Sequence, residues 1–160
     1  MKNMQLFIMR HGQASPIAAN DSQRELTPNG FLETSEMAKW LNDSKICFDN
    51  ILVSPFVRAQ QTAKTLMADK SSNAKLTTLD FITPSGNAKQ VHDYLDGLIN
   101  DQTNENLLIV SHMPLVSYLV EELTVDNACP IFQTAAIAHI DYDIKAMTGQ
   151  LVQLISPYDV

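Results

Sequence analysis

An arginine and a histidine stand side by side where the first apolar run of the chain ends. The run Met4-Gln5-Leu6-Phe7-Ile8-Met9 is followed at once by Arg10-His11-Gly12. A guanidinium is a fork of donors that suits phosphate oxygens, and an imidazole is a nucleophile or proton carrier near neutral pH. Gly12 has no Cβ, so a bound anion could approach the backbone closely. Taken alone, this tripeptide fits an incidental strand end as well as it fits an anion site.

Two later segments repeat this arrangement. Ser54-Pro55 follows the apolar run 51–53 and places Arg58 on the first turn of a predicted helix, and Ser111-His112 follows the apolar run 107–110. In an open parallel sheet the carboxyl ends of the strands share one edge, where ligands bind. We therefore expect two arginines and two histidines to surround one point, with helix N-termini adding N–H donors.

This set of side chains suits phosphoryl transfer. Two guanidiniums would bind the non-bridging oxygens and stabilise the charge that spreads over them in the transition state. One imidazole would attack phosphorus and form a phosphohistidine intermediate that water hydrolyses, and the other would donate to a phosphoryl oxygen. The attacking ring needs a free lone pair, so its second nitrogen should donate to a backbone carbonyl. Carboxylates and histidines show no metal-ligand spacing, so neither metal nor cofactor is expected.

Strand and helix patterns alternate four times along the chain. Buried strands are expected near 4–10, 51–53, 75–82 and 107–110. Helices are expected to begin at Thr27-Pro28 and at Ser54-Pro55, to cover about 91–98, and to run from the segment after Ser111-His112-Met113-Pro114 to about 123. Both Thr27-Pro28 and Ser54-Pro55 have the pattern of an N-cap followed by proline at the first helical position. The alternation predicts an α/β fold: a three-layer α/β/α sandwich whose mostly parallel sheet has helices on both faces.

Two further strands are expected near 134–142 and 150–156, with Thr148-Gly149 between them. No helical pattern separates these strands, which predicts a hairpin and therefore at least one antiparallel strand.

Composition places the chain among ordinary globular domains. With 160 residues, 45% of them hydrophobic and 18% charged, a single domain over 1–160 is expected. The net charge of −7 argues against binding to nucleic acid or to an anionic membrane, so an anion site must be a local basic pocket. Cys47 and Cys129 lack metal-ligand partners in sequence, which favours free thiols in a reducing cytosol. The run after Lys2 is too short for a signal peptide, and we expect a cytoplasmic protein.

Three motifs, in this order, resemble the histidine phosphatase superfamily, which has the phosphoglycerate mutase-like fold: Arg10-His11-Gly12, Ser54-Pro55-Phe56-Val57-Arg58-Ala59-Gln60-Gln61-Thr62 and Val110-Ser111-His112-Met113-Pro114. The likeness is greatest to its small phosphohistidine phosphatases and extends to 26–30, 93–95 and 131–138. The resemblance makes His11 the nucleophile and places Arg10, Arg58 and His112 in the phosphate pocket. It also implies a further phosphate contact from Arg24, in the loop before Leu26-Thr27.

One segment departs from the pattern of family members that act on phosphate esters. Those members usually place an acidic proton donor after the third strand, where this chain has Leu79-Asp80-Phe81-Ile82-Thr83-Pro84. An alkoxide leaving group needs a proton, whereas imidazole, whose conjugate acid has a pKa near 6.5, leaves readily. The sequence therefore favours a metal-independent protein phosphohistidine phosphatase over a phosphatase or mutase of small phosphate esters. Whether Asp80 donates a proton stays open.

A short chain also leaves little material for a lid, which suits phosphate presented on a protein surface. The expected partner is the phosphorylated histidine-phosphotransfer domain of a sensor kinase, or a phosphocarrier protein, and a monomer is expected. A non-catalytic phosphohistidine-binding module is a third hypothesis, which the intact set Arg10, His11, Arg58 and His112 disfavours. His92 and His139 are interpreted as solvated or structural histidines.

Overall fold

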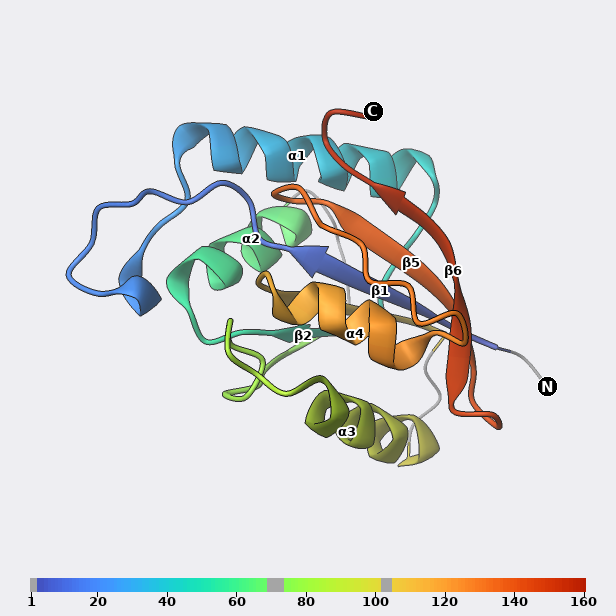
Figure 1. The fold of residues 1–160 in the computed structure, drawn as a ribbon. Helices are drawn as coiled ribbons and strands as arrows, with labels where there is room; N and C mark the ends of the chain where they lie inside the picture. Colours follow the sequence, from blue (N-terminus) through green and yellow to red (C-terminus); the bar gives the residue numbers. More distant parts are fainter. Residues whose placement is uncertain (1–2, 69–73, 102–104) are drawn as a thin grey trace.

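The fold is built around a mixed sheet with the strand order β3-β2-β4-β1-β5-β6 (Figure 1). The computed structural model describes residues 3–68, 74–101 and 105–160. The strands are β1 (Met4–Arg10), β2 (Asn50–Val53), β3 (Lys75–Thr78), β4 (Asn106–Ser111), β5 (Ile137–Asp143) and β6 (Thr148–Ile155). The helices are α1 (Pro28–Asp43), α2 (Val57–Met67), α3 (Ala88–Asp101) and α4 (Leu115–Leu123), with a short 3-10 turn, η1 (Asp21–Gln23), between β1 and α1.

The register of the parallel strands brings three strand ends to one level. β1, β2, β3 and β4 are parallel, whereas β5 pairs antiparallel with β1 and β6 pairs antiparallel with β5. Arg10 lies opposite Ser111, and Val53 lies opposite Val110. The residues that follow β1, β2 and β4 therefore emerge together at one edge, as the sequence predicted, and the mostly parallel sheet with an antiparallel hairpin is confirmed.

Each face of the sheet carries one pair of helices (Figure 1). Successive side chains of a strand point to opposite faces. Leu6 and Ile8 of β1 belong to a core with α3 and α4, while Phe7 and Met9 belong to a second core with α1 and α2. All four of these side chains are almost wholly buried. This confirms the three-layer α/β/α sandwich and explains why the central strands read as continuous apolar runs.

The strand expected over 75–82 is shorter than its apolar pattern suggested. β3 ends at Thr78, and the following residues form a turn in which Leu79 and Ile82 remain buried. Burial in a turn produces the same apolar signal as burial in a strand.

Two other boundaries in the sequence analysis were wrong. α2 begins at Val57, and Ser54 is not its N-cap, because the Ser54 hydroxyl accepts the N–H of Phe56 and contacts His112 instead. The hairpin turn lies between Asp143 and Thr148, so Thr148-Gly149 is already part of β6. Asp143 Oδ1 accepts the backbone N–H groups of Lys145 and Ala146. These bonds close the turn before Gly149, the glycine at which the sequence pattern had placed it.

The structure also describes the two cysteines and the lengths of the helices. Cys47 and Cys129 are both free and exposed. Within 3–68, 74–101 and 105–160, none of the helices is long and apolar enough to span a membrane.

The start of α1 offers a test of how the fold is held near the first loop. Thr27 accepts the N–H of Gly30 over 3.0 Å, and its hydroxyl donates to Gln13 Oε1 over 2.7 Å. We expect Thr27→Ala to lower the free energy of unfolding by about 1 kcal/mol, because an N-cap acceptor is lost. Urea titrations measure the free energy of unfolding of both variants. Thr27→Ser keeps the hydroxyl, and its free energy of unfolding should stay within about 0.5 kcal/mol of that of the wild type. Equal losses in both variants would contradict the capping role.

Candidate active site

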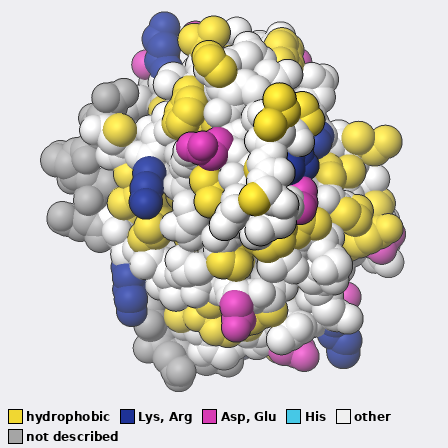
Figure 2. Space-filling model, turned by 90° about the vertical axis from the view of Figure 1, so that its left-hand side faces the viewer, with side chains coloured by type: hydrophobic (Ala, Val, Ile, Leu, Met, Phe, Trp, Pro, Cys, Tyr) yellow, Lys and Arg dark blue, Asp and Glu magenta, His cyan; other side chains and the backbone are white. Residues whose placement is uncertain are grey.

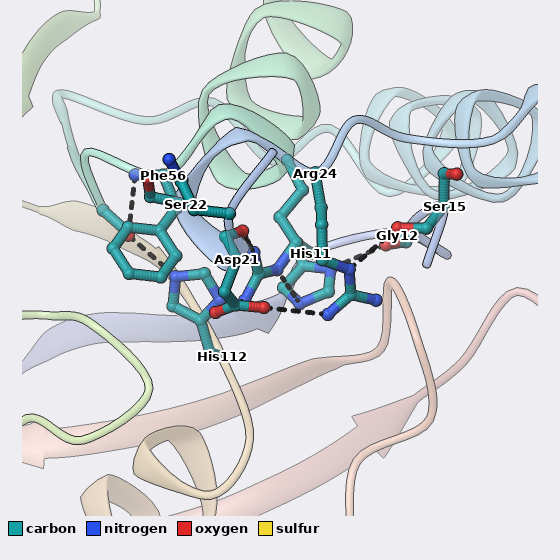
Figure 3. Close-up of polar contacts among 11 residues, drawn as sticks. His11, Gly12, Ser15, Asp21, Ser22, Arg24, Phe56 and His112 are labelled. Carbon is teal, nitrogen blue, oxygen red and sulfur yellow. Dashed lines mark hydrogen bonds and ion pairs between the residues drawn. The ribbon is translucent and has the colours of Figure 1, made fainter. Parts of the chain in front are cut away.

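The ends of β1, β2 and β4 bring two histidine rings together. The His11 N–H donates to Ser111 O over 3.0 Å, and the Ser54 N–H donates to Val110 O over 3.1 Å, so pairing continues just past each strand. The rings of His11 and His112 then lie edge to face, with centroids 5.0 Å apart (Figure 3). The convergence predicted from three separate motifs is present.

A hydrogen bond to the backbone determines which ring nitrogen of His11 carries the proton. Nδ1 lies 2.6 Å from Gly12 O. A carbonyl oxygen can only accept, so Nδ1 carries the ring proton and Nε2 keeps its lone pair. Arg58 Nε donates to that lone pair over 3.2 Å. This is the arrangement that the sequence analysis required of an attacking imidazole.

His112 is held through Nε2, whereas His11 is held through Nδ1. Its Nε2 lies 2.7 Å from Ser54 Oγ, and the same hydroxyl oxygen accepts the N–H of Phe56 over 3.2 Å. The Ser54 hydroxyl can donate its hydrogen to Nε2, and in that arrangement the ring proton of His112 lies on Nδ1. Nδ1 is buried, and in the described ranges it has no hydrogen-bond partner. A buried N–H donor of this kind is suited to an oxyanion.

Arg58 is the central cation of the site. Its side chain is 4% exposed, and its guanidinium donates to His11 Nε2, to Asp21 O over 2.6 Å and to Asp21 Oδ2 over 3.1 Å. The Phe56 ring lies under this guanidinium at 5.1 Å and meets the His112 ring at 5.1 Å. Phe56 therefore packs Arg58 and His112 against one apolar wall, with a cation–π contact on one side.

Two further arginines border the same histidines. Arg24 donates from Nε to Ser15 O over 2.8 Å and from Nη1 to Asp21 Oδ1 over 3.0 Å. Arg10 donates from Nη1 to Phe132 O over 2.8 Å, while its buried Nε has no partner within the described residues. The structure thus brings together all five side chains singled out from sequence: Arg10, His11, Arg24, Arg58 and His112.

Burial and positive charge keep both rings neutral. Burial lowers the pKa of His11 to about 4, and Arg58, Arg10 and Arg24 act in the same direction against the bond to Gly12. Burial also lowers the pKa of His112 to about 2, with smaller contributions in the same direction from His11 and Arg58. At neutral pH the site therefore pairs an unprotonated imidazole lone pair with fixed guanidinium charge.

The loop after β1 passes very close to α1. A Cβ on Gly12 would lie 2.6 Å from Gly30 O and 2.9 Å from Thr34 Oγ1, so only glycine fits there. The Gly12 N–H donates to Thr62 Oγ1 over 3.1 Å, and Thr62 in turn donates to Arg58 O. Gly12 thus serves to dock the loop on α1 and α2, which is a different use from the anion approach suggested by sequence.

Sequence reasoning missed two acidic residues of this region. Asp21 lies in a polar loop, and a lone acid in such a loop gives no signal of its contacts in the sequence. Glu33 is buried, and its carboxylate accepts from Gln13 N and from the hydroxyls of Thr134 and Tyr158. A signal for Glu33 did exist, because it lies one helical turn from Met37 on the buried face of α1.

Other candidate residues lie outside the site. Asp80 is exposed in the turn after β3, and its carboxylate forms no hydrogen bond or ion pair within the described part of the chain. His92 bonds Glu122 and Tyr142, and His139 bonds Gln5 Oε1, so both are structural as expected. Among the described residues there is no group of three or more side chains that could hold a metal ion.

Comparisons with known proteins agree with this geometry. Residues 6–81 match the model of the histidine phosphatase superfamily (branch 1). The chain is 43% identical over 140 residues to the phosphohistidine phosphatase SixA of Escherichia coli (strain K12), covering 88% of this chain and 86% of that one. It is 37% identical over 147 residues to the SixA homolog of Haemophilus influenzae, covering 88% and 89%.

The fold of this chain also matches that of a solved structure. A solved structure of the protein histidine phosphatase SixA complexed with tungstate superposes with a TM-score of 0.92 at 41% identity, covering 97% of this chain and 98% of that one. The ordered motifs, the shared sheet and this degree of identity over most of both chains lead to one conclusion: the chain belongs to the histidine phosphatase superfamily.

Proposed function

We propose that this chain, acting as a single domain over 1–160, is a metal-independent protein phosphohistidine phosphatase in which His11 is the nucleophile. The observation that carries the proposal is the tautomer of His11. Its Nδ1–H is committed to Gly12 O, and its Nε2 lone pair faces Arg58 in a site whose rings are neutral. An imidazole held in this way is ready to form a bond to phosphorus.

The reaction has two displacements. In the first, His11 Nε2 attacks phosphorus, the bond from phosphorus to the substrate imidazole breaks, and the departing nitrogen takes up a proton from solvent water. In the second, a water oxygen attacks phosphorus, the water gives a proton to solvent, the bond to His11 Nε2 breaks, and inorganic phosphate leaves. The lone pair on Nε2 is thereby restored, and the ring keeps its Nδ1–H bond to Gly12 throughout.

The cations and His112 act on the transferred group. Arg10, Arg24 and Arg58 bind its non-bridging oxygens and stabilise the charge that develops on them. His112 donates from Nδ1, the nitrogen that Ser54 leaves free. Because these donors are set before the substrate arrives, little reorganisation is needed in the transition state.

A phosphohistidine substrate fits the acid–base balance of the site. Asp21 is the carboxylate that, in the described ranges, contacts Arg24 and Arg58, and hydrogen bonds from Arg24 and Arg58 lower its pKa. A carboxylate held ionised is a poor donor to an alkoxide, whereas an imidazole leaving group needs less help. The name of the relative that is 43% identical, phosphohistidine phosphatase, supports the same substrate.

The partner of this reaction is then a phosphorylated protein. We place a histidine-phosphotransfer domain of a sensor kinase, or a phosphocarrier protein, in this role. The face at the carboxyl ends of the strands has apolar, basic and acidic side chains interspersed over it (Figure 2), which suits a protein surface better than a polyanion. A cytoplasmic monomer belongs to the same proposal and agrees with the free thiols of Cys47 and Cys129.

Replacing the nucleophile tests the mechanism. We expect His11→Ala to abolish an acid-labile phosphoenzyme and to lower turnover about a thousandfold or more, because the attacking lone pair of Nε2 is lost. Labelled phosphate transfer followed by gel separation measures the intermediate. His92→Gln, which changes a histidine outside the site, should retain both. A phosphoenzyme in the His11→Ala protein would exclude His11 as the acceptor. A His11→Ala protein that still binds phosphate and keeps the biological effect of the wild type would favour the non-catalytic phosphohistidine-binding module.

Substrate choice tests the function itself. Turnover should be compared on a phosphorylated histidine-phosphotransfer domain, on a phosphocarrier protein and on a panel of sugar and nucleotide phosphates. We expect kcat/KM to be higher for the phosphohistidine proteins than for every ester. Faster turnover of a small ester would replace the proposal by the alternative, a phosphate-ester phosphatase or mutase of the same superfamily.

The lowered pKa values of the two rings predict how stability depends on pH. Between pH 6.5 and about 4 the unfolded chain binds protons on His11 and His112 that the folded protein does not bind. The free energy of unfolding should therefore decrease as pH falls through this range. Urea titrations of a His11→Gln/His112→Gln double variant should show a shallower decrease, because glutamine does not titrate. An unchanged slope would contradict the neutral, buried state of the rings.

A further inference from the structure

The carboxylate of Asp21 occupies the donors that a phosphoryl group would need. Its Oδ2 lies 3.1 Å from Arg58 Nη2, and its Oδ1 lies 3.0 Å from Arg24 Nη1. Figure 3 shows this carboxylate beside the rings of His11 and His112. Asp21 therefore spans two of the three arginines of the site with both of its oxygens.

Asp21 and a phosphoryl group cannot share these donors. A phosphoryl group on His11 Nε2 brings its oxygens next to Arg58, because Arg58 Nε already lies 3.2 Å from that nitrogen. Two anions on the same guanidinium would repel each other at short range. The carboxylate must leave Arg58 before the phosphoryl oxygens can take its place.

The structure gives the Asp21 side chain a way to leave. Asp21 is 56% exposed at its side chain and opens η1, a turn of only three residues. The backbone there has its own anchors, because Asp21 O accepts from Arg58 Nη1 over 2.6 Å and from the N–H of Arg24. Rotation of the side chain into solvent breaks two partly exposed ion pairs, which are weak contacts, and leaves the loop in position.

Charge compensation explains why a carboxylate is placed here at all. Arg58 is almost wholly buried, Arg10 is partly buried, and each lowers the pKa of His11. Clustered buried cations without an anion are costly. Asp21 supplies an anion to Arg58 and Arg24 in the free protein, and a phosphoryl group supplies it in the complex.

Building on the proposed function, we propose that Asp21 is an internal ligand of the phosphate pocket that the phosphoryl group displaces and that returns when inorganic phosphate leaves. Asp21 thereby sets the affinity for substrate and for product without touching the reacting atoms. It is a positioning residue, and it weakens phosphate binding in proportion to how fully it occupies the arginines.

Binding of inorganic phosphate, measured by calorimetry, tests this inference without any turnover. If the carboxylate occupies the arginines about nine-tenths of the time, Asp21→Asn should bind phosphate about tenfold more tightly. KM should fall together with this dissociation constant, and product inhibition should grow stronger. Asp80→Asn makes the same change in net charge on an exposed acid outside the site, and it should bind phosphate as wild type does.

Three results separate the outcomes. Tightening in Asp21→Asn of less than about threefold, or weaker binding, would overturn the inference while leaving the phosphate pocket intact. Absence of phosphate binding in wild type and both variants would overturn the proposed function as well. A structure of the wild-type protein with tungstate needs no variant: Asp21 Oδ2 should lie beyond hydrogen-bond distance of Arg58 Nη2, and retention of that contact would overturn the displacement.

Discussion

The hydrogen bond between His11 Nδ1 and Gly12 O is the contact on which the proposed chemistry of this molecule depends. It decides which ring nitrogen carries the proton, and therefore which nitrogen can react. The carbonyl must in turn be held still, and this is the task of the close packing of Gly12 on Gly30 and of the bond from Gly12 N to Thr62. A side chain on Gly12 would push the loop from α1 and turn the ring with it.

The buried arginines need counter-ions, and two acidic residues on opposite sides of the site supply them. Behind the site, the Glu33 carboxylate lies near Arg10 and holds the loop before β5 through Thr134. In front of the site, Asp21 faces solvent and contacts Arg24 and Arg58. The buried acid is fixed by several donors, whereas the exposed one is held, among the described residues, by the side chains of Arg24 and Arg58. This difference separates a permanent counter-ion from an exchangeable one.

Much of this arrangement could be predicted from the sequence, because the strongest signals were local. Each apolar run that ended in a polar motif proved to be a strand ending at the site, and Arg10, His11, Arg58 and His112 followed from that edge. What could not be predicted depends on contacts across long sequence distances. The bond of Ser54 to His112 spans 58 positions, and a Ser-Pro pair alone is more typical of a helix cap. The place of Asp21 depends on a loop conformation that no periodicity describes.

The last residues of the chain contribute to the same region as the first ones. Tyr158 donates to Glu33, which holds Gln13 beside the first loop, and β1 is flanked on one side by β5. The segment with Arg10 and His11 is therefore synthesised well before the strand and the tyrosine that enclose it. The surroundings of Arg10 and His11 are complete only after β5 and Tyr158 have been made.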